Sequence, residues 1–188
     1  MNGTEHNGGH RERSRSGSPR FQGRYRGTVT DDVDPNGRGR LQVAVPDVLG
    51  DDPCIWAESA SPLVGQGMGI YAIPRRGAGV WVEFEDGDPD HAIWTGGWRG
   101  GSEDVPAAVS DAPPSQQPIV IRSEAGNEII LANVAGQGIT LQTSAGDQGP
   151  RIVITQTAIT LTTGNGASIE LTGPSVKINN DALTVDAP

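Results

Sequence analysis

The chain has 188 residues, which is long enough for one domain or two small ones, and its formal net charge of −9 disfavours a generic nucleic-acid binder. Its single cysteine, Cys54, excludes an intrachain disulfide. No apolar run approaches the length of a membrane span, and the polar first 20 residues lack the hydrophobic stretch of a secretory signal. We therefore expect synthesis in the cytoplasm without a signal peptide.

Residues 1–20 are rich in glycine, serine and arginine and differ in charge from the acidic remainder of the chain. This composition predicts a disordered basic tail. The alternative is a docking arm that becomes ordered on a partner. The arginines of the tail are Arg11, Arg13, Arg15 and Arg20.

Residues 21–100 hold every Trp, Tyr and Phe of the chain and are therefore the only stretch able to build a compact core. Alternating apolar and polar residues predict strands at 25–30, 41–45, 70–73, 80–85 and 92–97. Turn residues at 34–37 and 86–90 and prolines at 46 and 74 separate them. Short strands without a helical period predict a small closed barrel, and an SH3-like barrel would give a similar pattern. We expect Cys54 to be a small buried residue, since a nucleophilic role would need a base such as His91 beside it.

Residues 101–118 contain four prolines and predict an extended Pro-rich linker, too short for an inserted enzyme domain. Residues 119–188 contain no aromatic residue and carry eight short triplets whose outer two residues are aliphatic. This is the strand period of two, and it predicts a thin, rod-like β structure. The triplets are 119–121, 129–131, 139–141, 152–154, 159–161, 169–171, 176–178 and 183–185.

A single chain would leave these aliphatic side chains largely in water, because eight short strands give fewer than three coils of a β-helix. If three chains wind together, the inward residues meet their symmetry copies on the axis. We expect the strands then to pair their backbone groups between chains, with glycines at 126, 136, 138, 146, 149, 164, 166 and 173 at the corners. The predicted trimer core is Ile119, Ile121, Ile129, Leu131, Ile139, Leu141, Ile152, Ile154, Ile159, Leu161, Ile169, Leu171, Val176, Ile178, Leu183 and Val185.

Two stretches of the compact region resemble the OB-fold domain of phage baseplate assembly protein V and VgrG-type spikes. They are the run from Tyr25 through Asp34-Pro35 and Gly37-Arg38 to Pro46, and the run 73–90 with its Ile73-Pro74-Arg75-Arg76-Gly77 opening. Residues 123–129 and 176–180 are similar to repeats of the same family's C-terminal β-helix. The resemblance implies an all-β chain, with an OB-fold barrel over 21–100 and a C-terminal intertwined trimeric β-helix, a triangular needle, over 119–188. The family-signature residues are Gly37, Arg38, Pro74, Gly77, Gly87, Asp88, Pro89 and Asp90.

The resemblance also implies a function, the structural central spike of a contractile injection machine such as a phage tail or a type VI system. It implies a homotrimer under a baseplate hub, a PAAR-type tip protein, indirect contact with the inner tube and baseplate, and contact with the target membrane only by mechanical puncture. The N-terminal hub domain of full-length VgrG has no counterpart here, so the hub would be a separate chain. Candidate tip or cap-binding residues are Leu183, Val185 and Pro188.

Other chemistry is less well supported by the sequence. Residues 32–37 copy half of a calcium loop but lack its closing glutamate, which favours a β-turn. Asp86, Asp88 and Asp90 favour an acidic hairpin, and the glycines at 65–69 favour a flexible loop. Glu83 and Glu85 would share a strand face without a pocket. We expect no catalytic residue, no metal and no cofactor.

The sequence leaves two rival functions open. One is an OB-fold module that binds an oligosaccharide or a nucleic acid on a fibrous trimeric stalk, using exposed Trp56, Trp81 and Trp98 for stacking. The acidic charge disfavours nucleic acid. The other is a hydrolase, which would need a pocket with a perturbed carboxylate pair.

Overall fold

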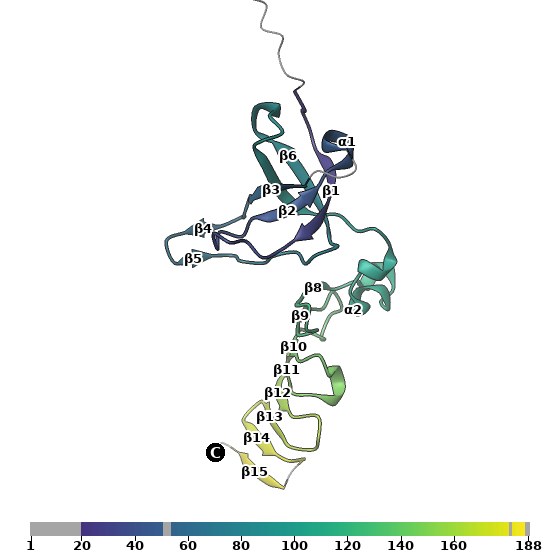
Figure 1. The fold of residues 1–188 in the computed structure, drawn as a ribbon. Coiled ribbons are helices and arrows are strands. Elements are labelled where there is room, and N and C mark those ends of the chain that lie inside the picture. The colour runs from purple at the N-terminus through teal and green to yellow at the C-terminus, as the bar shows by residue number, and fades with distance from the viewer. Residues whose placement is uncertain (1–19, 51–53, 181, 187–188) are drawn as a thin grey trace, which may run out of the picture. The chain divides into compact units, whose positions relative to one another are not determined.

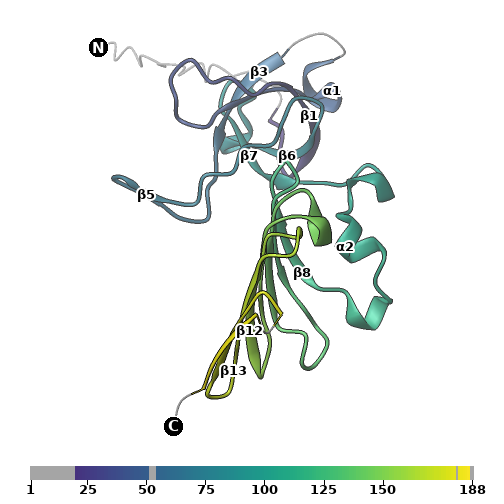
Figure 2. The same cartoon turned by 90° about the horizontal axis from the view of Figure 1, so that it is seen from below.

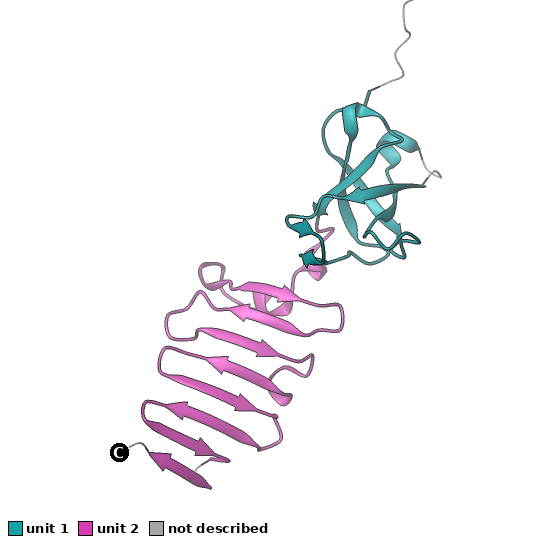
Figure 3. Cartoon of the chain, turned by 90° about the vertical axis from the view of Figure 1, so that its left-hand side faces the viewer, with its two compact units in different colours: residues 1–98 teal, residues 99–188 magenta. Residues whose placement is uncertain are grey.

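The computed structural model describes residues 20–50, 54–180 and 182–186. The predicted basic tail therefore lies outside the described residues except for Arg20. The chain divides into two compact units, residues 1–98 and 99–188 (Figure 3).

The first unit is built on a closed five-stranded barrel (Figure 1). Its strands are β1 (Tyr25–Asp31), β2 (Leu41–Ala44), β3 (Cys54–Ser59), β6 (Gly79–Phe84) and β7 (Ala92–Gly97), in the order β1-β2-β3-β7-β6. Neighbours are antiparallel except β3 and β7, which are parallel. A closed five-stranded barrel in this order has the OB architecture, as predicted. The four-residue helix α1 (Pro46–Leu49) follows β2.

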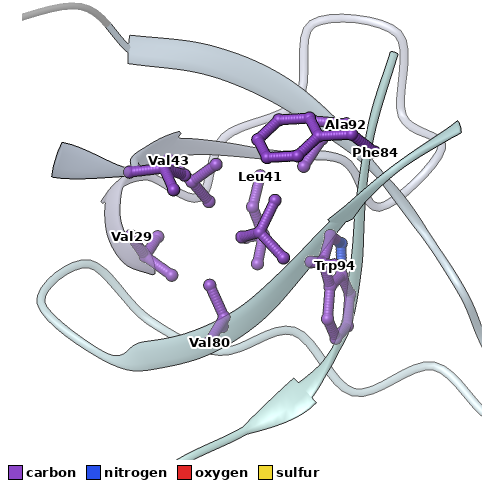
Figure 4. Close-up of a cluster of buried hydrophobic side chains, with 10 residues drawn as sticks. Val29, Leu41, Val43, Val80, Phe84, Ala92 and Trp94 are labelled. Carbon is purple, nitrogen blue, oxygen red and sulfur yellow. The ribbon is translucent and has the colours of Figure 1, made fainter. Parts of the chain in front are cut away.

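The core of the barrel is small and is made by inward residues of its strands together with Val45, which follows β2 (Figure 4). Along β6 the residues alternate as the sequence predicts, with Val80, Val82 and Phe84 inward. The one buried tryptophan, Trp94, keeps its polar atom satisfied, because its Nε1–H donates to the carbonyl oxygen of Gly39 at 3.2 Å. The buried set is Val29, Leu41, Val43, Val45, Ala57, Val80, Val82, Phe84, Ala92 and Trp94.

Three predictions for the barrel are wrong. Residues 70–73 are not a strand, and the missing strand is β3, whose only fully buried residue is Ala57, so its apolar alternation is weak. Cys54 is exposed rather than buried, because it lies at the start of β3, away from that inward position. Residues 65–69 are not a loop without structure. They form most of a two-stranded hairpin of β4 (Val64–Gly65) and β5 (Met68–Gly69).

The segment between the barrel and the sheet belongs to the second unit and is not extended as predicted. It contains three short helical turns: η2 (Ser102–Asp104), α2 (Ala107–Ser110) and η3 (Pro114–Gln116). Helix α2 contacts β8 (Ile119–Arg122), and Figure 2 shows it to one side of the sheet. The predicted domain boundaries themselves stay predictions.

The rest of the second unit is one eight-stranded antiparallel sheet in which each strand pairs with the next along the chain (Figures 1 and 3). Each predicted triplet lies within one strand. After β8 come β9 (Glu128–Leu131), β10 (Ile139–Gln142), β11 (Arg151–Ile154), β12 (Ala158–Thr162), β13 (Ser168–Thr172), β14 (Ser175–Ile178) and β15 (Leu183–Asp186). The 3-10 turn η4 (Gly146–Gln148) precedes β11.

This arrangement corrects the expected backbone pairing. The ladders run within one chain, from β8 to β15, and not between chains. The reason is the shortness of the turns, which lets consecutive strands fold back beside one another. Both edges of β9 to β14 are thus occupied within the chain, and contacts of these strands with another chain would be made by side chains.

Glycines shape the turns of the sheet. Of the eight predicted corner glycines, all have positive φ except Gly149, whose φ is −118°. At Gly138 (φ +72°) an added Cβ would lie 1.9 Å from the carbonyl oxygen of Ile154, so no other residue fits without backbone movement. At Gly164 an added Cβ would lie 2.2 Å from the carbonyl oxygen of Gln148. Successive turns are thus packed directly against one another.

Candidate functional site

The most distinctive surface of the chain is one face of the eight-stranded sheet, where all sixteen predicted trimer-core residues lie. Strand register places them in two columns, because Leu161 lies opposite both Ile152 and Ile169, and every other member is paired in the same way. The first column is Ile119, Leu131, Ile139, Ile154, Ile159, Leu171, Val176 and Val185. The second is Ile121, Ile129, Leu141, Ile152, Leu161, Ile169, Ile178 and Leu183.

Among the described residues, none covers this face, which is called the apolar face. Its residues are 36–63% exposed, apart from Ile139, Val176 and Ile178, which are half-buried. A single sheet buries aliphatic side chains only against their own neighbours, so about a third or more of each stays in water. A continuous apolar surface of this length marks an interaction site rather than an ordinary exterior.

A groove of about 920 Å³ runs along the second column of the apolar face. One wall is made by the aliphatic column itself, for example Ile129, Ile152 and Ile169. Small or polar residues where the strands run into turns, such as Thr143 and Ala167, line the other side. The groove thus offers a long, aliphatic seat parallel to the direction in which the strands stack.

The opposite face of the sheet carries the middle residues of the triplets. They are aliphatic near β8, with Val120 and Ile130 paired, and polar near β15, where Glu170 lies opposite Lys177. This change along the sheet fits a surface that faces water over most of its length.

One polar cluster on the sheet was not predicted. Glu128 is 6% exposed and accepts hydrogen bonds from Arg122 and from Gln142 Nε2, the latter at 2.8 Å. These three residues are direct strand neighbours, so the charge of Glu128 is compensated inside the sheet. The only signal in the sequence is a charged or amide residue immediately beside each of three aliphatic triplets.

The predicted tip residues lie at the last strand. Leu183 and Val185 are exposed on β15, and Pro188 lies outside the described residues. Strand β15 pairs with β14 on one side only, so its other edge carries backbone groups that no strand of the described chain pairs.

The signature residues Gly37 and Arg38 shape the loop between β1 and β2. The amide of Gly37 donates to the carbonyl oxygen of Asp34 at 3.0 Å, which confirms the predicted β-turn. The carboxylate of Asp34, 4% exposed, accepts the amides of Asn36 and Arg38 and pairs with the guanidinium of Arg40 at 2.8 Å. The Arg40 bond, with these backbone donors, holds the pKa of Asp34 well below its usual range. That carboxylate is therefore engaged in holding the loop.

The other signature residues lie at two further turns. Gly77, with φ +89°, donates its amide to the carbonyl oxygen of Val29 at 2.8 Å just before β6, after the half-buried Pro74. Gly87, Asp88, Pro89 and Asp90 form the loop between β6 and β7, which confirms the acidic hairpin. The Asp90 amide and then His91 lower the pKa of Asp88. The structure does not bring these groups to one site; each shapes its own turn.

The remaining candidates for chemistry are dispersed. Glu83 is bonded to Arg24 at 2.7 Å, and Glu85 lies beyond the end of β6, so the two carboxylates do not share a strand. Cys54 and His91 line the same cavity of about 470 Å³. Among the described residues there is no group of three His, Cys, Asp or Glu side chains suited to a metal ion. None of the helices in the described part of the chain is long and apolar enough to cross a membrane.

The tryptophans of the rival ligand-binding hypothesis are half-buried, not fully exposed. The guanidinium of Arg40 lies 5.1 Å from the ring of Trp56, and that of Arg26 lies 5.1 Å from Trp98 and 5.9 Å from Trp81. Trp98 also donates its Nε1–H to the carbonyl oxygen of Gly27 at 3.2 Å. Part of the stacking surface is thus already occupied by side chains of the chain itself.

Comparison with known protein families gives two matches. Residues 25–98 match the type VI secretion system/phage-baseplate injector OB domain. Residues 109–184 match the phage baseplate V C-terminal trimerisation domain. The first match covers the barrel, and the second covers nearly the whole sheet with its apolar face. A search of curated proteins finds no significant match.

Proposed function

Because the chain belongs to the baseplate V family of phage and type VI injector spike proteins, we propose that it is the central needle of a contractile injection machine. Both matched families are structural baseplate proteins, which indicates a non-enzymatic role and incorporation into a phage tail or injection particle. The finer proposal is that three copies form a rigid shaft beneath a separate hub protein and pierce the target envelope mechanically.

The observation that carries the proposal is the apolar face. The matched trimerisation domain supports a homotrimer, and the apolar face is the surface that a trimer would bury. Its two columns are not equivalent, since the groove follows only the second. We place the first column of each chain in the groove of the next, a cyclic contact that closes after three copies. The sixteen core residues then line the axis.

The mechanical role follows from how the sheet is bonded. Its backbone ladder continues through eight strands, each step adding about 4.8 Å along the stack. Compression along this direction would have to shorten hydrogen bonds in three walls at once, while the packed aliphatic interior resists collapse. Such a shaft transmits a push without chemistry of its own.

The ends of the shaft suggest the partners. The open edge of β15 with exposed Leu183 and Val185 is the proposed seat of a PAAR-type tip protein, together with Pro188. The barrel is the proposed attachment to the hub and, through it, to the baseplate and inner tube. No nucleic acid is part of this proposal, because the chain is acidic.

The test has two steps. Light scattering of the purified full chain should give three times the 19.6 kDa chain mass, and a monomer would contradict the proposal. Electron microscopy of particles from the host that encodes the chain, with a tag at the C-terminus, should then place the label on the central axis at the distal end. A label on the sheath or on peripheral fibres would refute the needle role even for a trimer.

A further inference from the structure

The β4–β5 hairpin belongs to the first unit but contributes neither to the barrel core nor to the proposed shaft. Five large apolar side chains there are exposed, with Val64 at 79% and Tyr71 at 73%, and none belongs to the buried core. In the described part of the first unit, the only other exposed large apolar residue is Val33. The hairpin patch is Leu63, Val64, Met68, Ile70 and Tyr71.

The hairpin is an ordered element held by hydrogen bonds at its base. Its base is closed by the Ile70 amide, which donates to the carbonyl oxygen of Leu63 at 3.0 Å, and by the Ser61 hydroxyl, which donates to the Ile70 carbonyl oxygen at 2.9 Å. Gly69 has φ +144°, and an added Cβ would lie 2.5 Å from the Leu63 carbonyl oxygen. The glycines therefore allow a tight ribbon that holds the apolar side chains outward.

Charge indicates what this patch can approach. Residues 62–73 contain no Asp, Glu, Lys, Arg or His, whereas the chain as a whole carries −9. An acidic protein is repelled by anionic lipid surfaces and by its own copies, except where its surface is uncharged. The hairpin patch is such a place, and burying it leaves no charge without a partner.

We propose that the hairpin patch packs against the barrel of a second copy within the trimer, so that the barrels as well as the sheets are joined. This inference rests on the proposed function. Because each barrel is covalently linked to its own sheet, assembly of three sheets would hold the other two barrels at a local concentration of roughly millimolar order. At that concentration a small uncharged patch suffices for association. A separate hub protein is not linked to the chain, so its effective concentration is not raised in this way.

The test uses the full chain with a benzophenone amino acid in place of Tyr71. Illumination should give covalent dimers and trimers, and mass spectrometry should map the adducts to residues 20–98 of another copy. The matched control carries the same group in place of Val33, which is equally exposed at 73% but lies outside the patch. We expect at least about tenfold fewer inter-copy adducts from the control.

The outcomes separate the two proposals. A monomeric mass before illumination would refute the trimer and the proposed function with it. Three outcomes with an intact trimer would overturn the hairpin inference alone. They are equal adduct yields at both positions, adducts only within one chain, and adducts that form only after a hub protein is added. As a second measurement, the Val64→Ser/Met68→Ser variant should stay trimeric and lower the barrel's Tm by about 4 °C or more, which a water-facing patch would not do.

Discussion

Leu161→Ala, compared with Thr160→Ala, gives the sharpest test of the apolar face. The two residues are neighbours in β12 and point to opposite faces of the sheet. In one chain Leu161 is the more exposed of the two, so its truncation should be the milder change if the chain works alone. If the apolar face is the centre of a trimer, the order reverses.

The magnitude follows from the exposed fraction. Complete burial of a leucine contributes about 1.5–3 kcal/mol, and the 38% of Leu161 that one chain leaves in water corresponds to about 0.6–1.1 kcal/mol. Three copies give about 2–3 kcal/mol per trimer, or roughly 30- to 150-fold in the association constant. A dry cavity left on the axis would add to this figure. For Thr160→Ala we expect a change within about 0.5 kcal/mol.

The assay is sedimentation velocity over a dilution series of each variant, with circular dichroism to check that the sheet stays folded. Leu161→Ala should dissociate at higher concentrations than the native chain, and Thr160→Ala should not. Equal behaviour of the two variants, or a trimer unaffected by Leu161→Ala, would refute the placement of this face on the axis.

Two further predictions concern the turns. Gly138→Ala should destabilise the sheet by several kcal/mol more than Gly136→Ala. Both glycines have positive φ, but only at Gly138 would the new Cβ meet the Ile154 carbonyl oxygen. Thermal unfolding measures the difference, and equal losses of stability would contradict the turn packing. Since Arg40 lowers the folded-state pKa of Asp34, that pair stabilises the barrel above the ordinary aspartate pKa of about 3.9 and loses its effect as the pH falls below it. Asp34→Asn should therefore lower the barrel's Tm at pH 7, with a difference from the native chain that shrinks toward pH 2, and a pH-independent difference would contradict this assignment.

The sequence predicted the parts of the fold that depend on a regular period. Each aliphatic triplet became a strand, and the alternation around Val82 located β6, because in these strands every second residue meets the core or the apolar face. Strand β3 was missed because a single alanine, Ala57, supplies its buried contact. The β4–β5 hairpin was missed because its glycines resemble a loop until the backbone pairs.

The period of two alone could not show whether each strand pairs within its own chain or with another chain. Alternation in a triplet fixes which side chains share a face, but it is the same whether the neighbouring strand belongs to the same chain or to another. The sixteen aliphatic residues do lie on one face, as the alternation predicts, whereas the assignment of their ladders was wrong and their role as a trimer core stays a prediction. Likewise, the Arg122–Glu128–Gln142 cluster depends on which strands become neighbours, which composition does not specify.

The intrachain meander has a consequence for how such a shaft changes size. Each strand with its turn forms one repeating unit that is hydrogen-bonded to the unit before it, and successive strands run in opposite directions. Removing or duplicating these units two at a time would preserve both aliphatic columns of the apolar face and would leave the chain end on the same side of the sheet. The length of the proposed shaft could thus vary in increments of roughly 10 Å, with the cross-section and the proposed threefold fit unaltered.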